Sequence, residues 1–338
     1  MLRLIRKSYL ALIFCMLFVA ILGGNFQMAH AAGNSYYVDA VNGSDSNDGL
    51  SNATAWQSLS KVNSKVFMPG DRILLKAGGV WTGQLYPKGS GTAGNPITID
   101  QYGTGSKPLI QGGGLIGGAV YLNNQEYMVI QNLEVTNKSD TMVDGIAGIL
   151  VEATDFGTLN SIKILNNYVH EVRGGHDGQN KYLGGIAVRA MGTLVSTRFN
   201  DVLIEGNRVE DVSRSGIVTH SLWRIRPGAS TGSGAYSAWT NVVVRNNSVK
   251  LTFGDGILVT TAVNALIEYN VNSYANSNNL GLFNAGIWAW NADGTIIQYN
   301  EAFATQIRMT GKVSISTMLR TAPLSNTTIA MIMKAALF

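Results

Sequence analysis

Five residues with different chemistry occupy the same position of a repeated sequence pattern. The pattern is Gly, apolar, any residue, apolar, and the fourth residue after the glycine is Glu152, Arg189, His220, Thr260 or Trp290. Successive side chains of a strand face opposite sides, so this position points outward when the apolar positions point inward. Strands stacked side by side would align the five residues in a column, with neighbours about 4.8 Å apart.

This column predicts catalytic residues. A carboxylate or an imidazole can act as an acid or a base, so Glu152 and His220 are candidates for proton transfer. Arg189 could hold an anionic sugar through charge-assisted hydrogen bonds. The alternative is that Glu152 and Arg189 only pair with each other across neighbouring strands on the surface.

Four tryptophans are candidates for contacts with sugar rings. Trp288 and Trp290 occupy the two outward positions of the last clear repeat, and adjacent outward indoles usually serve a contact. Trp223 and Trp239 lie in an insertion, residues 221–240, that is long for the turn of one repeat. Long loops on rigid scaffolds often carry sites, so we expect this insertion to form a cleft wall or a flap.

A second outward column contains carboxylates and a lysine. Glu210 and Asp211 follow one repeat, and Lys250 follows the next. A uronate lyase needs such groups, because calcium on carboxylates neutralises the uronate and a base removes the neighbouring proton. Glu210 and Asp211 are therefore candidate ligands for Ca²⁺, the cofactor that this chemistry would use. The alternatives are a solvated surface or a glycosidase, which needs two carboxylates at a defined spacing.

A second repeated pattern alternates with the first. It consists of two or three apolar residues and one or two polar residues, followed by asparagine, which suits a tight bend. Each unit is too short to bury its apolar face alone, whereas stacked coils bury these faces in one continuous column. The spacing favours a solenoid over an antiparallel sandwich. The asparagines are Asn132, Asn167, Asn207, Asn247, Asn270 and Asn300.

The residues before these repeats carry a resemblance to a known family. Tyr36-Tyr37-Val38-Asp39 precedes a run rich in Asp, Gly, Ser and Asn at residues 42–49, and residues 69–78 read PGDRILLKAG. Over about residues 35–307 the chain resembles right-handed parallel β-helix proteins of the pectin-lyase-like superfamily. The resemblance implies an all-β fold, a single right-handed parallel β-helix. It also implies a protein that acts on polysaccharides by lyase or hydrolase chemistry.

A short helix is expected near the start of this solenoid. Ala55, Leu59 and Val62 lie on one face of a helix at about residues 54–63. Such a helix could cover the open end of the solenoid, where strand backbone would otherwise be unpaired.

Composition and charge indicate which kinds of molecule the protein can bind. The chain has 338 residues, of which 46% are hydrophobic and only 14% charged. Seven basic residues lie in the first 31 and the last 31 residues, and these two segments contain no acid. The formal charge of +4 for the whole chain therefore leaves about −3 for the residues between them. A nucleic-acid partner therefore has no electrostatic support.

Residues 1–31 are predicted to be a signal peptide. Arg3, Arg6 and Lys7 precede an apolar run at about residues 9–22, and Ala29-His30-Ala31 offers a cleavage site. We expect a secreted, extracellular and monomeric protein without a membrane partner after cleavage. The mature chain would contain no cysteine, because Cys15 lies in the apolar run.

The segment 308–338 does not resemble the preceding repeats. It contains Met309, Met318, Met331 and Met333 but no acidic residue. Codons compatible with this segment can, in another frame, encode further repeats with two outward aspartates. We therefore expect a frameshifted, truncated product that aggregates at its C-terminal end; a divergent cap is the alternative.

The domain prediction is thus a signal peptide at 1–31, a parallel β-helix at 32–307 and an aberrant tail at 308–338. The predicted function is that of a secreted protein acting on an acidic, pectin-like polysaccharide by lyase or hydrolase chemistry. The alternatives are a non-catalytic glycan-binding or surface solenoid and an inactive truncated product.

Overall fold

The structure is a computed structural model that describes residues 33–141, 143–174, 182–277, 284–305 and 315–318. The predicted signal peptide lies outside the described residues. So does the segment 308–338, apart from residues 315–318.

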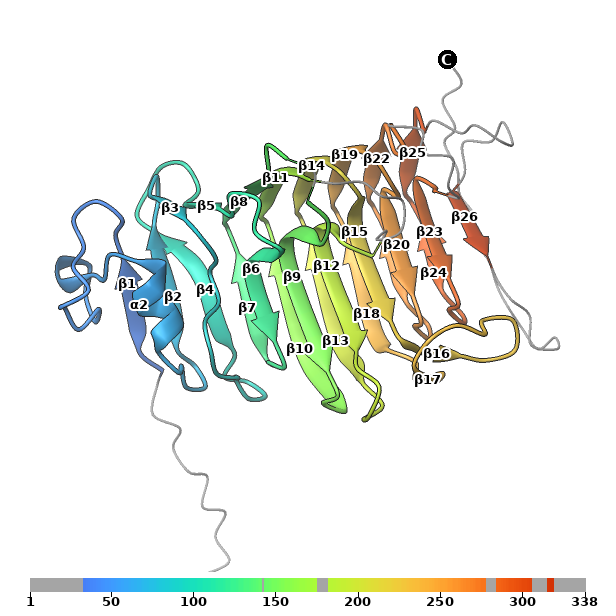
Figure 1. The fold of residues 1–338 in the computed structure, drawn as a ribbon, viewed down its shortest axis with the longest axis horizontal. Coiled ribbons are helices and arrows are strands. Elements are labelled where there is room, and N and C mark those ends of the chain that lie inside the picture. The colour runs from blue at the N-terminus through green and yellow to red at the C-terminus, as the bar shows by residue number, and fades with distance from the viewer. Residues whose placement is uncertain (1–32, 142, 175–181, 278–283, 306–314, 319–338) are drawn as a thin grey trace, which may run out of the picture. The chain divides into compact units, whose positions relative to one another are not determined.

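The described chain winds through three parallel sheets, and a full coil contributes one strand to each sheet (Figure 1). This confirms the all-β parallel β-helix. The parallel pairing of strands from successive coils excludes the antiparallel sandwich that was the alternative.

Sheet 1 has nine strands and sheet 2 has eight. The strands of sheet 1 are β1 (Ser35–Val38), β2 (Arg72–Lys76), β4 (Ile97–Tyr102), β7 (Met128–Gln131), β10 (Thr158–Leu165), β13 (Arg198–Glu205), β18 (Thr240–Arg245), β21 (Leu266–Glu268) and β24 (Ile296–Gln298). Those of sheet 2 are β3 (Val80–Thr82), β5 (Leu109–Gln111), β8 (Glu134–Lys138), β11 (Tyr168–Arg173), β14 (Arg208–Val212), β19 (Ser248–Thr252), β22 (Val271–Ser273) and β25 (Glu301–Phe303).

Sheet 3 has seven strands and carries the predicted site column. Its strands are β6 (Gly117–Asn123), β9 (Ile146–Thr154), β12 (Gly184–Met191), β15 (Ser215–Ser221), β20 (Ile257–Thr260), β23 (Ile287–Trp290) and β26 (Ile315–Met318). Two further strands, β16 (Trp223–Ile225) and β17 (Gly234–Ala235), form a small parallel sheet in the insertion.

Stacks of β-branched and aliphatic side chains fill the solenoid. On sheet 3 the inward Ile149, Ile186, Ile217 and Ile257 occupy equivalent positions in the strand register, and all four are fully buried. Fully burying one such side chain contributes about 1.5–3 kcal/mol, and parallel stacking repeats this gain in each coil.

The asparagines of the second pattern form a ladder inside the solenoid. The side-chain carbonyl of Asn207 accepts hydrogen bonds from the backbone N–H of Asn167 (3.0 Å) and from its side-chain amide (3.1 Å). The same pattern continues through Asn247, Asn270 and Asn300. All five are buried. Their main role is thus to satisfy buried polar groups between coils.

The tight bend that we expected at these asparagines has its left-handed residue one position earlier. The positive φ values fall on Asn166, Gly206, Asn246, Tyr269 and Tyr299. Asn132 differs, because it takes the left-handed position itself (φ 59°) and the N–H of Leu133 donates to Asn167.

The glycine of the first pattern is required for close packing. At Gly216 an added Cβ would lie 2.4 Å from Cγ1 of Val249 and 2.6 Å from the carbonyl oxygen of Gly256. Gly185 meets the same arrangement against Val209 and Gly216. The repeat therefore needs a residue without a side chain where consecutive coils approach each other.

The N-terminal end contains the expected short helix, in two pieces. A 3₁₀ turn, η1 (Asn52–Thr54), precedes α2 (Leu59–Ser64), whose first turn is capped by the Ser58 hydroxyl. Leu59 and Val62 of α2 are buried in the core, as predicted. The helix is shorter than expected because the chain between the two pieces is extended.

Part of the predicted tail continues sheet 3. Strand β26 pairs in parallel with β23, and Ile287 and Trp290 lie opposite Ile315 and Met318. This differs from our expectation of an aberrant tail over the whole of 308–338. The β-branched Ile315 and Thr317 suit a strand, and the free edge of β23 offers unpaired backbone groups.

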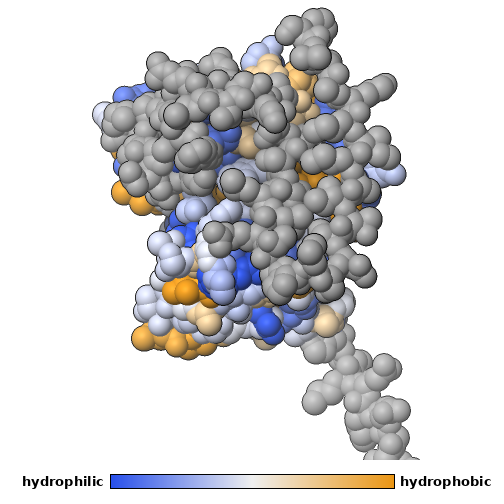
Figure 2. Space-filling model, turned by 90° about the vertical axis from the view of Figure 1, so that its right-hand side faces the viewer, coloured by the Kyte–Doolittle hydropathy of each residue, from blue (hydrophilic) through white to orange (hydrophobic). Residues whose placement is uncertain are grey.

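The last complete described coil carries partly exposed apolar side chains. Ile296 is 41% exposed and Tyr299 is 46% exposed, and the ring of Tyr299 stacks on Tyr269 at 5.0 Å. Figure 2, which shows this end of the solenoid, has hydrophobic residues scattered among hydrophilic ones on its described part.

Candidate functional site

The predicted outward column is present on sheet 3, but it is interrupted. Glu152, Arg189 and His220 lie side by side on β9, β12 and β15, and Thr260 lies beside Trp290 on β20 and β23. The Thr260 hydroxyl donates to the backbone carbonyl of Thr219 (2.9 Å), and Thr260 is fully buried. The column therefore splits into two groups with different surroundings.

Glu152 and Arg189 form a close ion pair. Nε of Arg189 donates to Oε2 of Glu152 at 3.0 Å, and Nη2 donates to the same oxygen. Each side chain is only 16% exposed. Their mutual pairing, which was our alternative, is thus present, and it leaves the Arg189 charge compensated.

The ion pair lines a cleft of about 380 Å³ over the outer face of β6, β9 and β12. Tyr121 of β6 and Leu150 of β9 are register neighbours and line it together. Its wall also contains Gln84 and Leu183. The cleft combines an apolar floor with a few polar groups, which is the usual composition of a small-molecule or sugar site.

Tyr121 can act as a hydrogen-bond donor at the cleft. Burial, and then the nearby Glu152 carboxylate, raise the pKa of Tyr121 to about 12. Its phenol therefore stays protonated over the ordinary pH range.

Sequence reasoning missed Tyr121. It occupies the first of the two outward positions of an earlier repeat, opposite Leu150. In that repeat Ala119 takes the place of the glycine. Allowing alanine at that place would have extended the pattern by one coil.

The other outward positions of sheet 3 form a second apolar cluster, which includes Leu150, Ala187, Val218, Leu258 and Trp288. This corrects our prediction for Trp288. Its side chain is only 8% exposed, and its Nε1 donates to Oδ1 of the buried Asp255 at 2.8 Å. The indole packs against the outer face of the sheet and does not present an open ring to a glycan. Trp290 is half-buried at the margin of this cluster.

His220 is also covered, which argues against its predicted catalytic role. It is 3% exposed, and its ring stacks on that of Tyr182 at 3.7 Å between centroids. Burial, followed by the charges of Arg224 and Arg189, lowers the pKa of His220 well below its usual value. The imidazole is therefore neutral and buried beside the cleft.

The insertion at residues 221–240 forms a wall that is anchored to the following coil, but none of its residues lines the cleft. Arg226 donates from Nε to Oδ1 of Asn291 (2.5 Å) and pairs through Nη1 with Asp293 (2.5 Å). The Tyr236 hydroxyl donates to Asp293 at 3.1 Å. These contacts join the insertion to the coil that follows β23, and they fix the position of Arg224 on β16.

Trp223 and Trp239 are buried and stabilise this wall by packing beneath it. This corrects their prediction as sugar contacts. Trp223 is 8% exposed and donates from Nε1 to the Met191 carbonyl at 3.2 Å. Trp239 is fully buried and packs against Phe199 at 4.7 Å between ring centroids. Large aromatic rings bury well at the base of an insertion, so residue type alone does not reveal which side they face.

The geometry also argues against the calcium site predicted at Glu210 and Asp211. Glu210 accepts hydrogen bonds from the Tyr168 hydroxyl (2.6 Å) and from Arg208 (2.8 Å). Asp211 accepts from Nε of Arg173 at 2.8 Å. Among the described residues, no group of three or more His, Cys, Asp or Glu side chains is placed to hold a metal ion.

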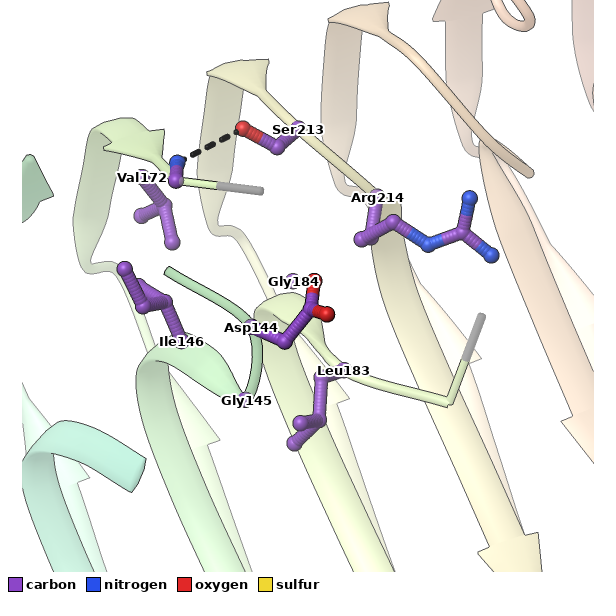
Figure 3. A pocket seen from close by; sticks show the side chains of 9 residues that line it. Asp144, Gly145, Ile146, Val172, Leu183, Gly184, Ser213 and Arg214 are labelled. Carbon is purple, nitrogen blue, oxygen red and sulfur yellow. Dashed lines mark hydrogen bonds between the residues drawn. The ribbon is translucent and has the colours of Figure 1, made fainter. Parts of the chain in front are cut away.

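A second cavity lies where β12 begins, between Asp144, Leu183, Ser213 and Arg214 (Figure 3). Its volume is about 10 Å³, which is space for about one water molecule. The Ser213 hydroxyl there accepts a hydrogen bond from the backbone N–H of Gly174 at 3.0 Å. This cavity is too small for a sugar, so the cleft beside Glu152 is the candidate site.

Fold and cleft together define a parallel β-helix protein with an open cleft of about 380 Å³ on sheet 3. No protein-family model matches the chain. A lacto-N-biosidase of Bifidobacterium longum subsp. longum is 28% identical over 361 aligned residues, covering 81% of this chain and 22% of the relative.

Two solved structures are also similar, and both are GH136 lacto-N-biosidase from Eubacterium ramulus. The selenomethionine derivative superimposes with a TM-score of 0.70 and 26% identity, covering 81% of this chain and 52% of that one. The native protein gives a TM-score of 0.64 and 25% identity, covering 80% and 56%. The chain thus spans about a fifth of the curated relative and about half of the solved one.

Among the described residues, no helix is both long and apolar enough to cross a bilayer.

Proposed function

We propose that this chain is the β-helix part of a carbohydrate-active enzyme of the glycoside hydrolase type, with the cleft on sheet 3 as its glycan site. The observation that carries the proposal is the cleft itself, in which Tyr121, Glu152 and Arg189 meet over Leu150 and Leu183. Similarity over 81% of the chain to lacto-N-biosidases supports a hydrolase rather than a lyase.

The cleft suits the neutral part of a glycan. Arg189 is compensated by Glu152, so the two side chains offer paired donors and acceptors to sugar hydroxyls without a net charge. Leu150 and Leu183 can pack against the apolar C–H face of a sugar ring. This differs from the pectin-like polymer expected from the sequence, for which uncompensated cations or calcium would be needed in the cleft.

The cleft fits the end of a sugar chain better than its middle. Beyond Arg189 the next coil presents His220 covered by Tyr182, and Arg224 lies over both Tyr182 and Trp290. None of these four residues lines the cleft itself, and we infer that together they close the groove on the side of Arg189. A closed end favours recognition of a terminal unit, whereas a groove open at both ends would accommodate a continuous polymer.

Glu152 is the single carboxylate among the described residues that line the cleft. Glycosidases generally use two carboxylates, separated by about 5–5.5 Å in retaining enzymes and about 6.5–9.5 Å in inverting ones. We therefore assign Glu152 to substrate contact, with a role as acid or base that depends on a second carboxylate from outside this lining. The same observation favours a second candidate function, a glycan-binding module without catalysis.

The cellular setting follows from the sequence. The basic and apolar segment at 1–31 favours export, so we propose an extracellular protein that meets free or surface glycans. We retain the monomer as the proposed state.

The test compares three assays on the full chain with neutral oligosaccharides and with uronate polymers. A hydrolase releases reducing ends, a lyase produces unsaturated products that absorb in the near ultraviolet, and a binding module gives neither but binds in calorimetry. Tyr121→Phe and Glu152→Gln should each weaken binding, while the matched control Tyr269→Phe, on an exposed tyrosine of another face, should not. Absence of binding to any glycan, or equal effects of Tyr121→Phe and the control, would refute the proposed site.

A further inference from the structure

Arg224 is held in a fixed orientation beside the coil that follows Arg189, outside the lining of the cleft. Its guanidinium carbon lies 5.5 Å from the ring centroid of Tyr182 and 5.3 Å from that of Trp290. Nε donates to the Thr231 carbonyl at 2.9 Å, and Nη1 donates to the Tyr182 hydroxyl at 3.2 Å. Contact with two aromatic rings and hydrogen bonds at two nitrogens restrict the guanidinium plane before any ligand arrives.

Among the described residues, no carboxylate compensates the charge of this guanidinium. Arg189 pairs with Glu152 and Arg226 pairs with Asp293, but Arg224 forms no ion pair with any described residue. Arginine has five N–H donors, and Arg224 uses at most three, even when the long 3.5 Å contact of Nη2 with Thr231 Oγ1 is included. At least two donors thus remain for a ligand.

The surroundings of Arg224 do not supply a compensating charge. The neighbouring His220 imidazole is neutral, because burial and then the positive charges of Arg224 and Arg189 lower its pKa. The hydrogen-bond partners of Arg224, Thr231 and Tyr182, are uncharged groups. Because Asp293 compensates Arg226, one uncompensated positive charge, that of Arg224, remains on the described part of this wall.

The charge lies within reach of the cleft through a short series of contacts. Tyr182 stacks on His220, and His220 is the register neighbour of Arg189, which lines the cleft. Leu183, adjacent in sequence to Tyr182, lines the cleft as well. A group attached to a sugar in the cleft can thus extend toward Arg224.

We propose that Arg224 forms a subsite for an anionic substituent, a carboxylate or a sulfate ester, on a glycan whose neutral part occupies the cleft. This inference rests on the proposed function, and it adds the substrate class of the terminal unit. A planar guanidinium with free N–H groups matches both anions, since each offers two oxygens to neighbouring donors. The insertion would then serve as a specificity element that the anchoring by Asn291 and Asp293 keeps in place.

The test uses one neutral oligosaccharide, the same oligosaccharide with one sialic acid, and the same one with one sulfate. Affinities are measured by calorimetry on the full chain at low salt and at 0.5 M NaCl. We expect the anionic forms to bind about tenfold more tightly than the neutral form, which corresponds to about 1.4 kcal/mol. The preference should shrink at high salt, because a partly exposed charge is screened.

Arg224→Gln should abolish this preference and leave affinity for the neutral form within about twofold. Arg224→Lys keeps the charge and should retain part of the preference, which separates loss of the subsite from misfolding of the wall. Arg198→Gln is the matched control. It removes an exposed arginine of sheet 1 whose Nε donates a hydrogen bond to Thr158, and it should behave like the parent.

The carboxylate and sulfate arms identify which anion is preferred. Equal affinity of the parent for neutral and anionic forms, or an undiminished preference in Arg224→Gln, overturns the subsite while leaving the proposed function standing. If none of the three compounds binds the parent protein, both proposals are wrong.

Discussion

Arg189 donates from two of its nitrogens to one carboxylate oxygen of Glu152, and this contact joins neighbouring coils in the lining of the cleft. The two groups are register partners on β12 and β9, so the contact follows directly from the parallel stacking. A coil-to-coil ion pair with this little exposure can support both stability and ligand contact.

The first prediction concerns this pair. Arg189→Met and Glu152→Gln should each lower the free energy of unfolding, and a double-mutant cycle should give a coupling of about 1 kcal/mol. Each single variant should also weaken glycan binding, because the remaining partner is left without compensation at the cleft. Chemical denaturation and calorimetry measure the two effects. Strictly additive single effects would show that the pair contributes no coupling.

The second prediction separates the two tryptophans of β23. Trp288→Ala should destabilise the protein by about 3–5 kcal/mol, since it empties a buried site and removes the donor to Asp255. Trp290→Ala, at a half-buried position, should cost clearly less. Thermal and urea unfolding of both variants compare them directly. Equal stability losses would contradict the placement of Trp288 beneath the outer surface.

The third prediction concerns the asparagine ladder. Asn207→Ala should lower the free energy of unfolding by about 2–3 kcal/mol, because Asn207 bonds the coils on both sides and its loss leaves buried groups on Asn167 unpaired. The exposed Asn52 serves as the control, and Asn52→Ala should change stability little. If Asn207→Ala lowered the free energy of unfolding no more than Asn52→Ala does, water would be replacing the hydrogen bonds of the ladder.

The fold could be predicted from the sequence because its signals are repeated. The alternation around Gly185 and Gly216 recurs in five successive coils, so it specified the inward face, the outward column and the strand register together. Asn207 was likewise recognisable by its place after each apolar run. Its partners were not, since the ladder depends on contacts between residues 40 positions apart.

The site was harder to predict, because a side chain on the outer face of a strand is not necessarily exposed to solvent. Trp288 and His220 occupy outward positions, yet Asp255 and Tyr182 from neighbouring turns cover them. Tyr121 was overlooked because Ala119 replaces a glycine. The pairing of Glu152 with Arg189 was predictable, because position and neighbour follow from the register alone.

The last prediction concerns the acid stability of the N-terminal end. Asp39 is 4% exposed and accepts hydrogen bonds from Lys76 Nζ (2.6 Å) and from the backbone N–H groups of Val41 and Asn42. Burial opposes ionisation, but the hydrogen bonds from Lys76 and from the two backbone groups outweigh it and lower the pKa of Asp39 to about 2.

A carboxylate whose pKa is lower in the folded state stabilises the fold above its unfolded pKa of about 3.9, and this contribution disappears as the pH falls toward 2. We therefore expect Asp39→Asn to cost about 2 kcal/mol at pH 7 and much less at pH 2, as measured by urea denaturation across this range. Asp140→Asn, at an exposed carboxylate, is the control and should show no such convergence. A stability difference between the parent and Asp39→Asn that stays constant from pH 7 to pH 2 would contradict the link between the buried carboxylate and acid unfolding.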